Sequence, residues 1–216
     1  MIFNLKNKQK NNFKLSGESD AGFMMTEILI VISIVILFSA IIISNFPQIK
    51  LQFAISRVTY KFTQDLRSTQ NLSLSSVQYK DSYGQQRPIN GYGVYVDINS
   101  LGDKKYIIYA DCAYHVTLSP NCPVNGNQQY DALDYVIDTI DFSLAEPGVV
   151  IKQLDNVFGN KASINFSPPN PDTTITSLDP SFNQYESRVD IVFALSSDLT
   201  KTRTVSVNTS GLIEVK

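Results

Sequence analysis

The chain is poor in the residues on which most catalytic and metal sites depend. Among 216 residues it has one histidine, His115, and two cysteines, Cys112 and Cys122. It contains no Gly-x-Ser-x-Gly, no phosphate-binding glycine loop and no zinc-binding motif. No internal repeat of fixed period occurs either. We therefore expect that the protein is not an enzyme.

An excess of positive charge is also missing. The chain has 18 Lys and Arg against 20 Asp and Glu, a net charge of −2. Beyond residue 22 the count is 14 against 18, a net charge of −4. A mildly acidic chain lacks the electrostatic footprint of a nucleic-acid-binding protein. Nucleic acid is therefore not an expected partner.

What the chain does have is one long apolar run near its start. From Phe23 to Ile43 the only charge is Glu27, and the other polar side chains are Thr26, Ser33 and Ser39. These 21 residues, at about 1.5 Å each, give a helix of roughly 31 Å, about one hydrocarbon thickness. A carboxylate in such a helix costs roughly 3 kcal/mol unless it finds a partner. Glu27 is therefore a candidate functional residue.

The residues around this run resemble a known processing segment. Gly22-Phe23, followed by Met-Met-Thr-Glu27 and a long Ile/Val/Leu run, is similar to the prepilin-type cleavage and methylation segment of type IV pilins and pseudopilins. The resemblance implies that a membrane enzyme, the prepilin peptidase, cuts after Gly22 and methylates the new terminus, Phe23. It also implies that Glu27 places each subunit against its neighbour in a helical filament, where the neighbour's freed amino group can pair with the carboxylate.

The run departs from this family in one respect. Typical members carry a glycine and a proline inside the helix, which let it partly melt in the fibre. Here the middle of the run is β-branched, and the only proline near its outer end is Pro47. The sequence therefore predicts the segment but not the position of a bend.

Two plainer explanations of the run fit less well. A secretory signal peptide has an apolar core of about 7–15 residues with a small-x-small cleavage site after it. Here the run is longer and has a glutamate at its start. A plain signal anchor explains the hydrophobicity, but it does not explain the register of Gly22, Phe23 and Glu27.

Charge and periodicity divide the chain into three parts. Residues 1–22 carry four lysines and are expected to be a cytoplasmic leader that is cleaved, which places the C-terminal domain outside. Residues 23–82 hold one long helix, expected to end near Val77, with a transmembrane part at 23–46. Its second half is amphipathic, with an apolar stripe formed by Leu51, Ile55, Val58, Phe62, Leu66 and Thr69. Lys61 and Asp65 can pair beside that stripe.

Residues 83–216 are expected to form an extracytoplasmic β-rich domain. From residue 90 onward the apolar period changes to two, and turn residues separate the runs. The expected strands are 92–98, 105–110, 135–140, 149–154, 162–166, 189–195, 203–207 and 212–215, with a hairpin between the first two. The predicted fold class is α+β, a long helix packed on an antiparallel β-sheet head as in the pilin fold.

Later segments carry a second, looser resemblance. They are similar to minor pseudopilins of the type called GspH or FimT, in the segments Asp65–Asn71, Ile164–Pro168, Val189–Phe193, Arg203–Asn208 and Gly211–Val215. Together with the N-terminal segment, the resemblance covers nearly the whole chain beyond the leader.

The region of the two cysteines holds the remaining candidate sites. In an exported domain Cys112 and Cys122 are expected to form a disulfide, because a metal site with His115 lacks two further ligands. Oxygen-bearing side chains around a nearby glycine are what a calcium loop offers, but the closing acidic residue is missing and such Asn/Gly clusters are usually turns. The calcium candidates are Asp111, Asn125, Asn127 and Asp131, and no other cofactor is expected. A solvated acidic edge is expected from Asp131, Asp134, Asp138 and Asp141.

Together these patterns predict a structural subunit of a type IV pilus or a type II secretion-like pseudopilus. Its expected partners are other pilin subunits, the prepilin peptidase and the pilus assembly platform. Its expected location is the cell membrane, with a single pass, and then an extracellular filament. Two alternatives stay open. A tip-located minor pilin acting as an adhesin or DNA-uptake module would expose a basic or aromatic patch, and a membrane-anchored hydrolase would have a convergent polar pocket.

Overall fold

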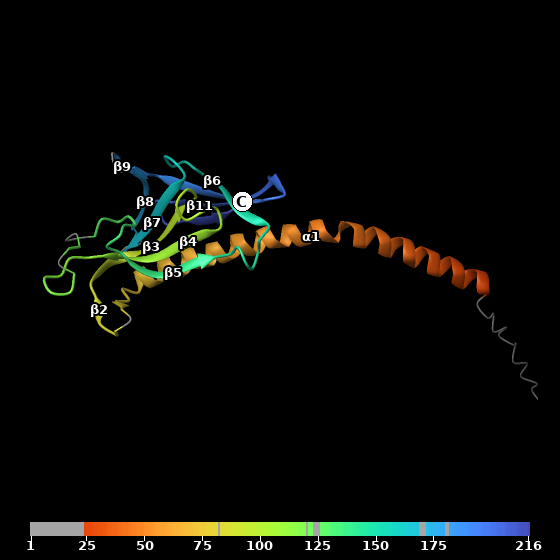
Figure 1. Ribbon diagram of the computed structural model, residues 1–216, viewed down its shortest axis with the longest axis horizontal. Helices are drawn as coiled ribbons and strands as arrows, with labels where there is room; N and C mark the ends of the chain where they lie inside the picture. Colours follow the sequence, from red (N-terminus) through yellow and green to blue (C-terminus); the bar gives the residue numbers. More distant parts are fainter. Residues whose placement is uncertain (1–23, 82, 120, 123–125, 169–171, 180–181) are drawn as a thin grey trace, which may run out of the picture. The chain divides into compact units, whose positions relative to one another are not determined.

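The computed structural model describes residues 24–81, 83–119, 121–122, 126–168, 172–179 and 182–216 (Figure 1). Contacts divide the chain into two compact units, residues 1–46 and 47–216. One helix, α1 (Met25–Leu74), contributes residues to both units, and strands occur only in the second among the described residues. The leader expected at residues 1–22 lies outside the described residues.

The part of α1 in the second unit is amphipathic, as its sequence predicts. Its inward stripe is buried and consists of Ile55, Val58, Phe62, Leu66 and Thr69, with Leu51 half-buried at its start. The hydroxyls of the buried Thr59 and Thr63 donate to the carbonyls four residues earlier, at 2.7 and 2.8 Å, so both threonines are buried without an unpaired donor. The expected ion pair between Lys61 and Asp65 is also present, at 2.5 Å.

The end of α1 differs from the sequence-based expectation by a few residues. The helix ends at Leu74 instead of near Val77. Ser76 has a positive φ of 50°. Its N–H donates to the carbonyl of Ser73, and the N–H of Val77 donates to the carbonyl of Leu72. This is a Schellman motif, which usually places a glycine at the left-handed position. A serine there gives no glycine signal, so the sequence suggested a longer helix.

The second unit, residues 47–216, is called the head below. Besides the second half of α1 it contains antiparallel sheets. The larger one has the order β5-β4-β3-β7-β8-β9 and consists of β3 (Ile89–Asp97), β4 (Lys105–Cys112), β5 (Tyr135–Asp141), β7 (Lys161–Ser167), β8 (Asp172–Asp179) and β9 (Phe182–Glu186). The second has the order β12-β11-β10-β6 and consists of β6 (Val149–Asp155), β10 (Arg188–Leu195), β11 (Asp198–Asn208) and β12 (Ile213–Val215). A short ribbon pairs β1 (Tyr79–Lys80) with β2 (Gln86–Arg87).

All eight predicted strands are present, and the predicted hairpin is β3–β4, with Tyr92 opposite Ala110. Four strands were not predicted, namely β1, β2, β8 and β9. β8 is rich in threonine and follows a proline cluster, so it lacks the alternating apolar pattern that marks a half-buried strand. It is fixed instead by pairing with β7, where Ile175 lies opposite Ile164.

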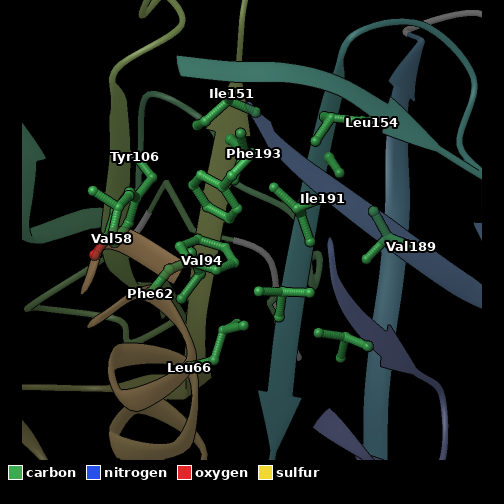
Figure 2. Packing of buried hydrophobic residues seen from close by; sticks show 14 of the residues in the cluster. Val58, Phe62, Leu66, Val94, Tyr106, Ile151, Leu154, Val189, Ile191 and Phe193 are labelled. Carbon is green, nitrogen blue, oxygen red and sulfur yellow. The ribbon is translucent and has the colours of Figure 1, made fainter. Parts of the chain in front are cut away.

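The second half of α1 and the two larger sheets share one core. Figure 2 shows Phe62 and Leu66 of α1 beside Val94, Ile191 and Phe193 of the strands. Phe62 is fully buried, and its ring lies 4.9 Å from that of Tyr106 and 5.4 Å from that of Phe193, edge-on to both. The predicted fold class is thus confirmed at the level of α+β with a long helix and antiparallel sheets.

Candidate functional site

The apolar segment of the first unit is the most unusual surface of the chain. Met25–Ile43 is long and apolar enough to cross a membrane, and none of its residues is buried against the rest of the described chain. Individual side chains such as Ile30, Phe38 and Ile43 are 58%, 60% and 71% exposed. An apolar surface of this extent is stable only when lipid or another protein covers it.

Glu27 is the single ionisable side chain in this segment. It lies in the first turn of α1, where the N–H of Glu27 donates to the carbonyl of Met24 at 2.8 Å. The positive end of the helix dipole stabilises a carboxylate at this position by about 0.3–1 kcal/mol. No ion pair or side-chain hydrogen bond reaches the Glu27 carboxylate from the described residues. A partner for the charge therefore has to come from outside these residues.

The serines of the segment do not need a hydrogen-bond partner from outside the helix. The hydroxyl of Ser33 donates to the carbonyl of Leu29, and that of Ser39 donates to the carbonyl of Val35, each at 2.8 Å. Both hydroxyls are satisfied inside the helix, which is how serine is accommodated in lipid. Their presence is compatible with a membrane span, and it leaves Glu27 as the costly group.

The two processing residues expected from the resemblance, Gly22 and Phe23, lie outside the described residues. The first described residue is Met24, which is 74% exposed. The prediction of cleavage between Gly22 and Phe23, and of methylation at Phe23, thus stays a prediction.

The expected disulfide between Cys112 and Cys122 is confirmed. Their Cα atoms are 5.7 Å apart, within the usual range for a disulfide. Cys112 ends β4 and is almost fully buried, so the bridge ties the following loop to the sheet. In that loop His115 faces its own turn, because its Nδ1 lies 3.2 Å from the N–H of Leu118 and 3.3 Å from that of Thr117.

The calcium candidates do not converge as ligands. The buried Asp111 accepts the N–H groups of Asn127 and Gln128 at 3.3 and 3.0 Å. The amide of Asn127 donates to Asp131 at 2.5 Å. A calcium site needs oxygen atoms aimed at one point, whereas these carboxylates face N–H donors. Asn125 lies outside the described residues, and the described chain holds no group of three His, Cys, Asp or Glu side chains that could hold a metal.

Asp134 is not part of a solvated edge, which corrects the expectation for this residue. Its carboxylate accepts the N–H of Cys112 and that of Asp131, each at 2.8 Å. Burial raises the pKa of Asp134 to about 7 and that of Asp111 to about 6, because loss of water around the charge outweighs these hydrogen bonds. Asp138 and Asp141 are exposed, as expected. The spacing of Asp131 and Asp134, typical of a turn closed by a side chain, was the available signal.

A tyrosine cluster next to the cysteine loop was also missed. Tyr130 stacks on Tyr95 with ring centres 4.6 Å apart and lies edge-on to Tyr109 at 5.3 Å. Tyr109 occupies the space above Gly93, where a Cβ atom would lie 2.4 Å from the ring. The Tyr109 hydroxyl is hydrogen-bonded to Ser163 at 2.5 Å. The segment around Tyr130 is thus packed onto the sheet.

A pocket of mixed polar and apolar lining lies where α1 ends, with a volume of about 290 Å³. Its charged lining residue is Arg87, which pairs with Asp81 at 2.8 Å and donates to the carbonyl of Leu118 at 2.7 Å. The described lining includes no histidine, cysteine or carboxylate beside its serines.

No protein-family model, no curated protein and no solved structure matches the chain. The class of protein is therefore described from its fold, its apolar segment and its disulfide alone. It is an α+β protein with an N-terminal apolar helix, a possible membrane anchor or signal sequence, and a disulfide-linked antiparallel head.

Proposed function

We propose that the chain is a structural subunit of a type IV pilus or a type II secretion-like pseudopilus. In this proposal the prepilin peptidase cuts between Gly22 and Phe23 and methylates Phe23. The subunit waits in the membrane with its head outside, and the assembly platform then adds it to an extracellular filament. The pilin resemblance in the sequence supports each of these steps.

One observation carries the proposal: a helical segment of 19 residues, Met25–Ile43, is exposed on all sides and contains one ionisable group. A helix that is apolar all round is stable in lipid, and it is equally stable in a filament core where neighbouring helices replace the acyl chains. A subunit that moves from membrane to fibre needs this property. A globular enzyme that only needs an anchor does not need an acidic residue at a fixed place in it.

Glu27 supplies register in this scheme. An unpaired carboxylate costs roughly 3 kcal/mol in a membrane helix. The axial position of a subunit that pairs Glu27 is therefore more stable than positions shifted along the filament axis, in which Glu27 is unpaired. Cleavage after Gly22 would make Glu27 the fifth residue of the mature chain and create a free amino group at Phe23. That amino group on a neighbouring subunit is a positive charge at a matching depth. The helix terminus and the carboxylate then neutralise each other between subunits.

The head has the features of a fibre coat. Its helix stripe is buried against the antiparallel sheets, so the head is a folded body carried by α1 and does not depend on the apolar segment for its core. The disulfide between Cys112 and Cys122 suits an oxidising location outside the cytoplasm. Both features support an extracytoplasmic domain.

Cleavage-site blocking tests the proposal. We expect Gly22→Leu to leave an uncleaved precursor that sediments with membranes and is absent from sheared fibres. Ala21→Leu, one residue before, is the matched control and should be processed at a rate close to the unaltered chain. Fibres labelled by an antibody to the head in the Gly22→Leu strain, at the density of the unaltered strain, would contradict the proposal.

A further inference from the structure

The outward face of α1 in the second unit has an ordered pattern of its own. Opposite the buried stripe, exposed residues recur at alternating spacings of four and three; we call these six the outer seam, and they are Phe53, Arg57, Tyr60, Gln64, Arg67 and Asn71. This is the heptad spacing with which one helix presents a continuous line to a partner. The seam is thus a second amphipathic line on the same helix.

Two aromatic rings stand on this line, one heptad apart. Phe53 is 60% exposed and Tyr60 is 59% exposed, and together with Arg57 and Lys61 they line a shallow groove. Large aromatic side chains and arginine are the residues most enriched in the energetic centre of protein interfaces. Solvent exposure of both rings on a helix whose other face is fully packed indicates a contact that the isolated chain does not make.

In the second unit, the helix has a net positive charge and the remaining residues have a net negative charge. Residues 47–74 carry four cations against one carboxylate, a net charge of +3, whereas residues 75–216 carry 10 against 16, a net charge of −6. Arg57 and Lys61 are paired within the chain, to Glu146 and Asp65. Arg67 has no ion pair among the described residues. The outer seam is therefore complementary to a protein surface that is acidic and partly apolar.

Strand β5 offers such a surface. It lies at one end of the larger sheet and pairs only with β4 among the described strands. Near Ile140 it borders Val58 and Lys61 of α1 in the same copy, whereas residues 136–139 are exposed. Val136 and Ile137 are 44% and 39% exposed, and Asp138 beside them is exposed as well. An edge strand with exposed apolar side chains is covered by another chain in a stable assembly. Its negative charge complements the seam, and its apolar side chains suit the two rings.

We propose that the outer seam of one copy docks on the β5 edge of a second copy of this chain. This inference rests on the proposed function, because both surfaces are used only when subunits meet. The outer seam and the exposed residues 136–138 of β5 are different patches, so the contact is heterologous. Repetition of a heterologous contact gives a ring or an open helical array in place of a closed two-fold dimer, and the proposed function requires the helical array. Head-to-head contact of this kind adds a second specific interface to the one made by the apolar segments.

A photo-cross-linker placed on the seam tests the contact in intact cells. The full-length chain carries p-benzoylphenylalanine at position 60, and cross-linked peptides are identified by mass spectrometry in both membrane and fibre fractions. We expect peptides containing residues 135–141 of a second copy. Cross-links that go only to lipid, to nucleic acid, to an unrelated protein or to the same copy would overturn the inference. Nucleic acid is an informative rival, because aromatic and cationic side chains on one line also suit a single strand.

Charge reversal tests the pairing chemistry. Arg67→Glu alone and Asp138→Lys alone should each lower the amount of chain recovered in sheared fibres roughly tenfold. The double variant should recover much of that loss, because the two charges again have opposite signs. Equal loss in the double variant and in the worse single variant would contradict the pairing of these surfaces.

An aromatic control separates this inference from the proposed function. Tyr60→Ala should reduce fibre incorporation, whereas Tyr185→Ala, at a residue 65% exposed on β9, should not. If both variants assemble normally with a mature Phe23 terminus, the inference fails and the proposed function stands. If the unaltered chain forms no fibres and is never cut at Phe23, the proposed function fails, and the position-60 cross-link in membranes still decides the inference.

Discussion

At the scale of single residues, Glu27 combines two properties that rarely occur together. It is at the positive end of a helix, where a carboxylate is modestly stabilised, and it belongs to a segment in which a lone charge is costly. The first property would be met by any acidic residue in the first turn. Only the second requires a partner, and the proposed partner is an amino group on a neighbouring subunit.

Replacement of Glu27 separates these properties. We expect Glu27→Ala to insert in the membrane as well as the unaltered chain, because it removes a charge from an apolar segment. Its recovery in sheared fibres should fall at least tenfold, since the register contact worth a few kcal/mol is lost. Thr26→Ala is the matched control next to it, and quantitative immunoblotting of both fractions is the measurement. Normal incorporation of Glu27→Ala would count against the pairing.

The buried carboxylates Asp111 and Asp134 predict a pH dependence of stability. Burial holds the pKa of Asp111 at about 6 and that of Asp134 at about 7, above the value near 3.9 expected in the unfolded chain. The folded state then keeps protons that the unfolded state releases. Their contribution to stability is complete below about pH 4 and is lost as the pH rises through 6 and 7.

We therefore expect the free energy of unfolding to decrease by on the order of 4 kcal/mol between pH 5 and pH 8. Urea titrations of the detergent-solubilised chain, followed by circular dichroism, measure it. Asp134→Asn should flatten this slope whatever it does to stability at a single pH, and Asp138→Asn, at an exposed position, should leave the slope unchanged. A stability that rises with pH over this interval would contradict the burial argument.

At the scale of elements, α1 has two faces that serve different ends. The inward stripe is core, and the outer seam is solvent-exposed in the isolated chain. Phe62→Ala should cost roughly 3–5 kcal/mol of folding stability, because it opens a cavity between Tyr106 and Phe193. Phe53→Ala, nine residues earlier on the outer face, should change folding stability by less than about 0.5 kcal/mol. Similar losses for both variants in urea titrations would contradict the assigned faces.

Periodicity predicted the elements whose buried face is formed by apolar residues. The stripe of α1 and the alternating strands β3, β4 and β10 were visible because burial selects apolar residues at the helical or strand period. Strand β8 was missed because pairing with β7, a long-range contact, defines it. The end of α1 was misplaced because a serine takes the left-handed position that a glycine usually marks.

In the candidate site, too, some residues could be predicted from the sequence and others could not. Glu27 and the cysteine pair could be predicted because each is conspicuous in its context, as a lone charge in an apolar run or as the only two thiols. The burial of Asp134 and the covering of Tyr109 by Tyr130 could not, since they depend on how the cysteine loop folds back on the sheet. The outer seam is recognisable only after the buried face of α1 is known.

At the scale of the whole molecule, the chain divides into an apolar helical unit and a self-contained head. In the proposed function, the first unit exchanges lipid for neighbouring helices, and the head keeps its own core and its disulfide during this step. We therefore propose that the apolar segment and the outer seam make the assembly contacts, and that the sheets and loops form the outer surface of the fibre.

The most direct test of the central claim is the intact mass of the chain taken from sheared native fibres. The account predicts a single N-terminus at Phe23 carrying one added methyl group, with the disulfide between Cys112 and Cys122 intact. A chain that keeps Met1–Gly22, or one that begins after the apolar segment, would contradict it.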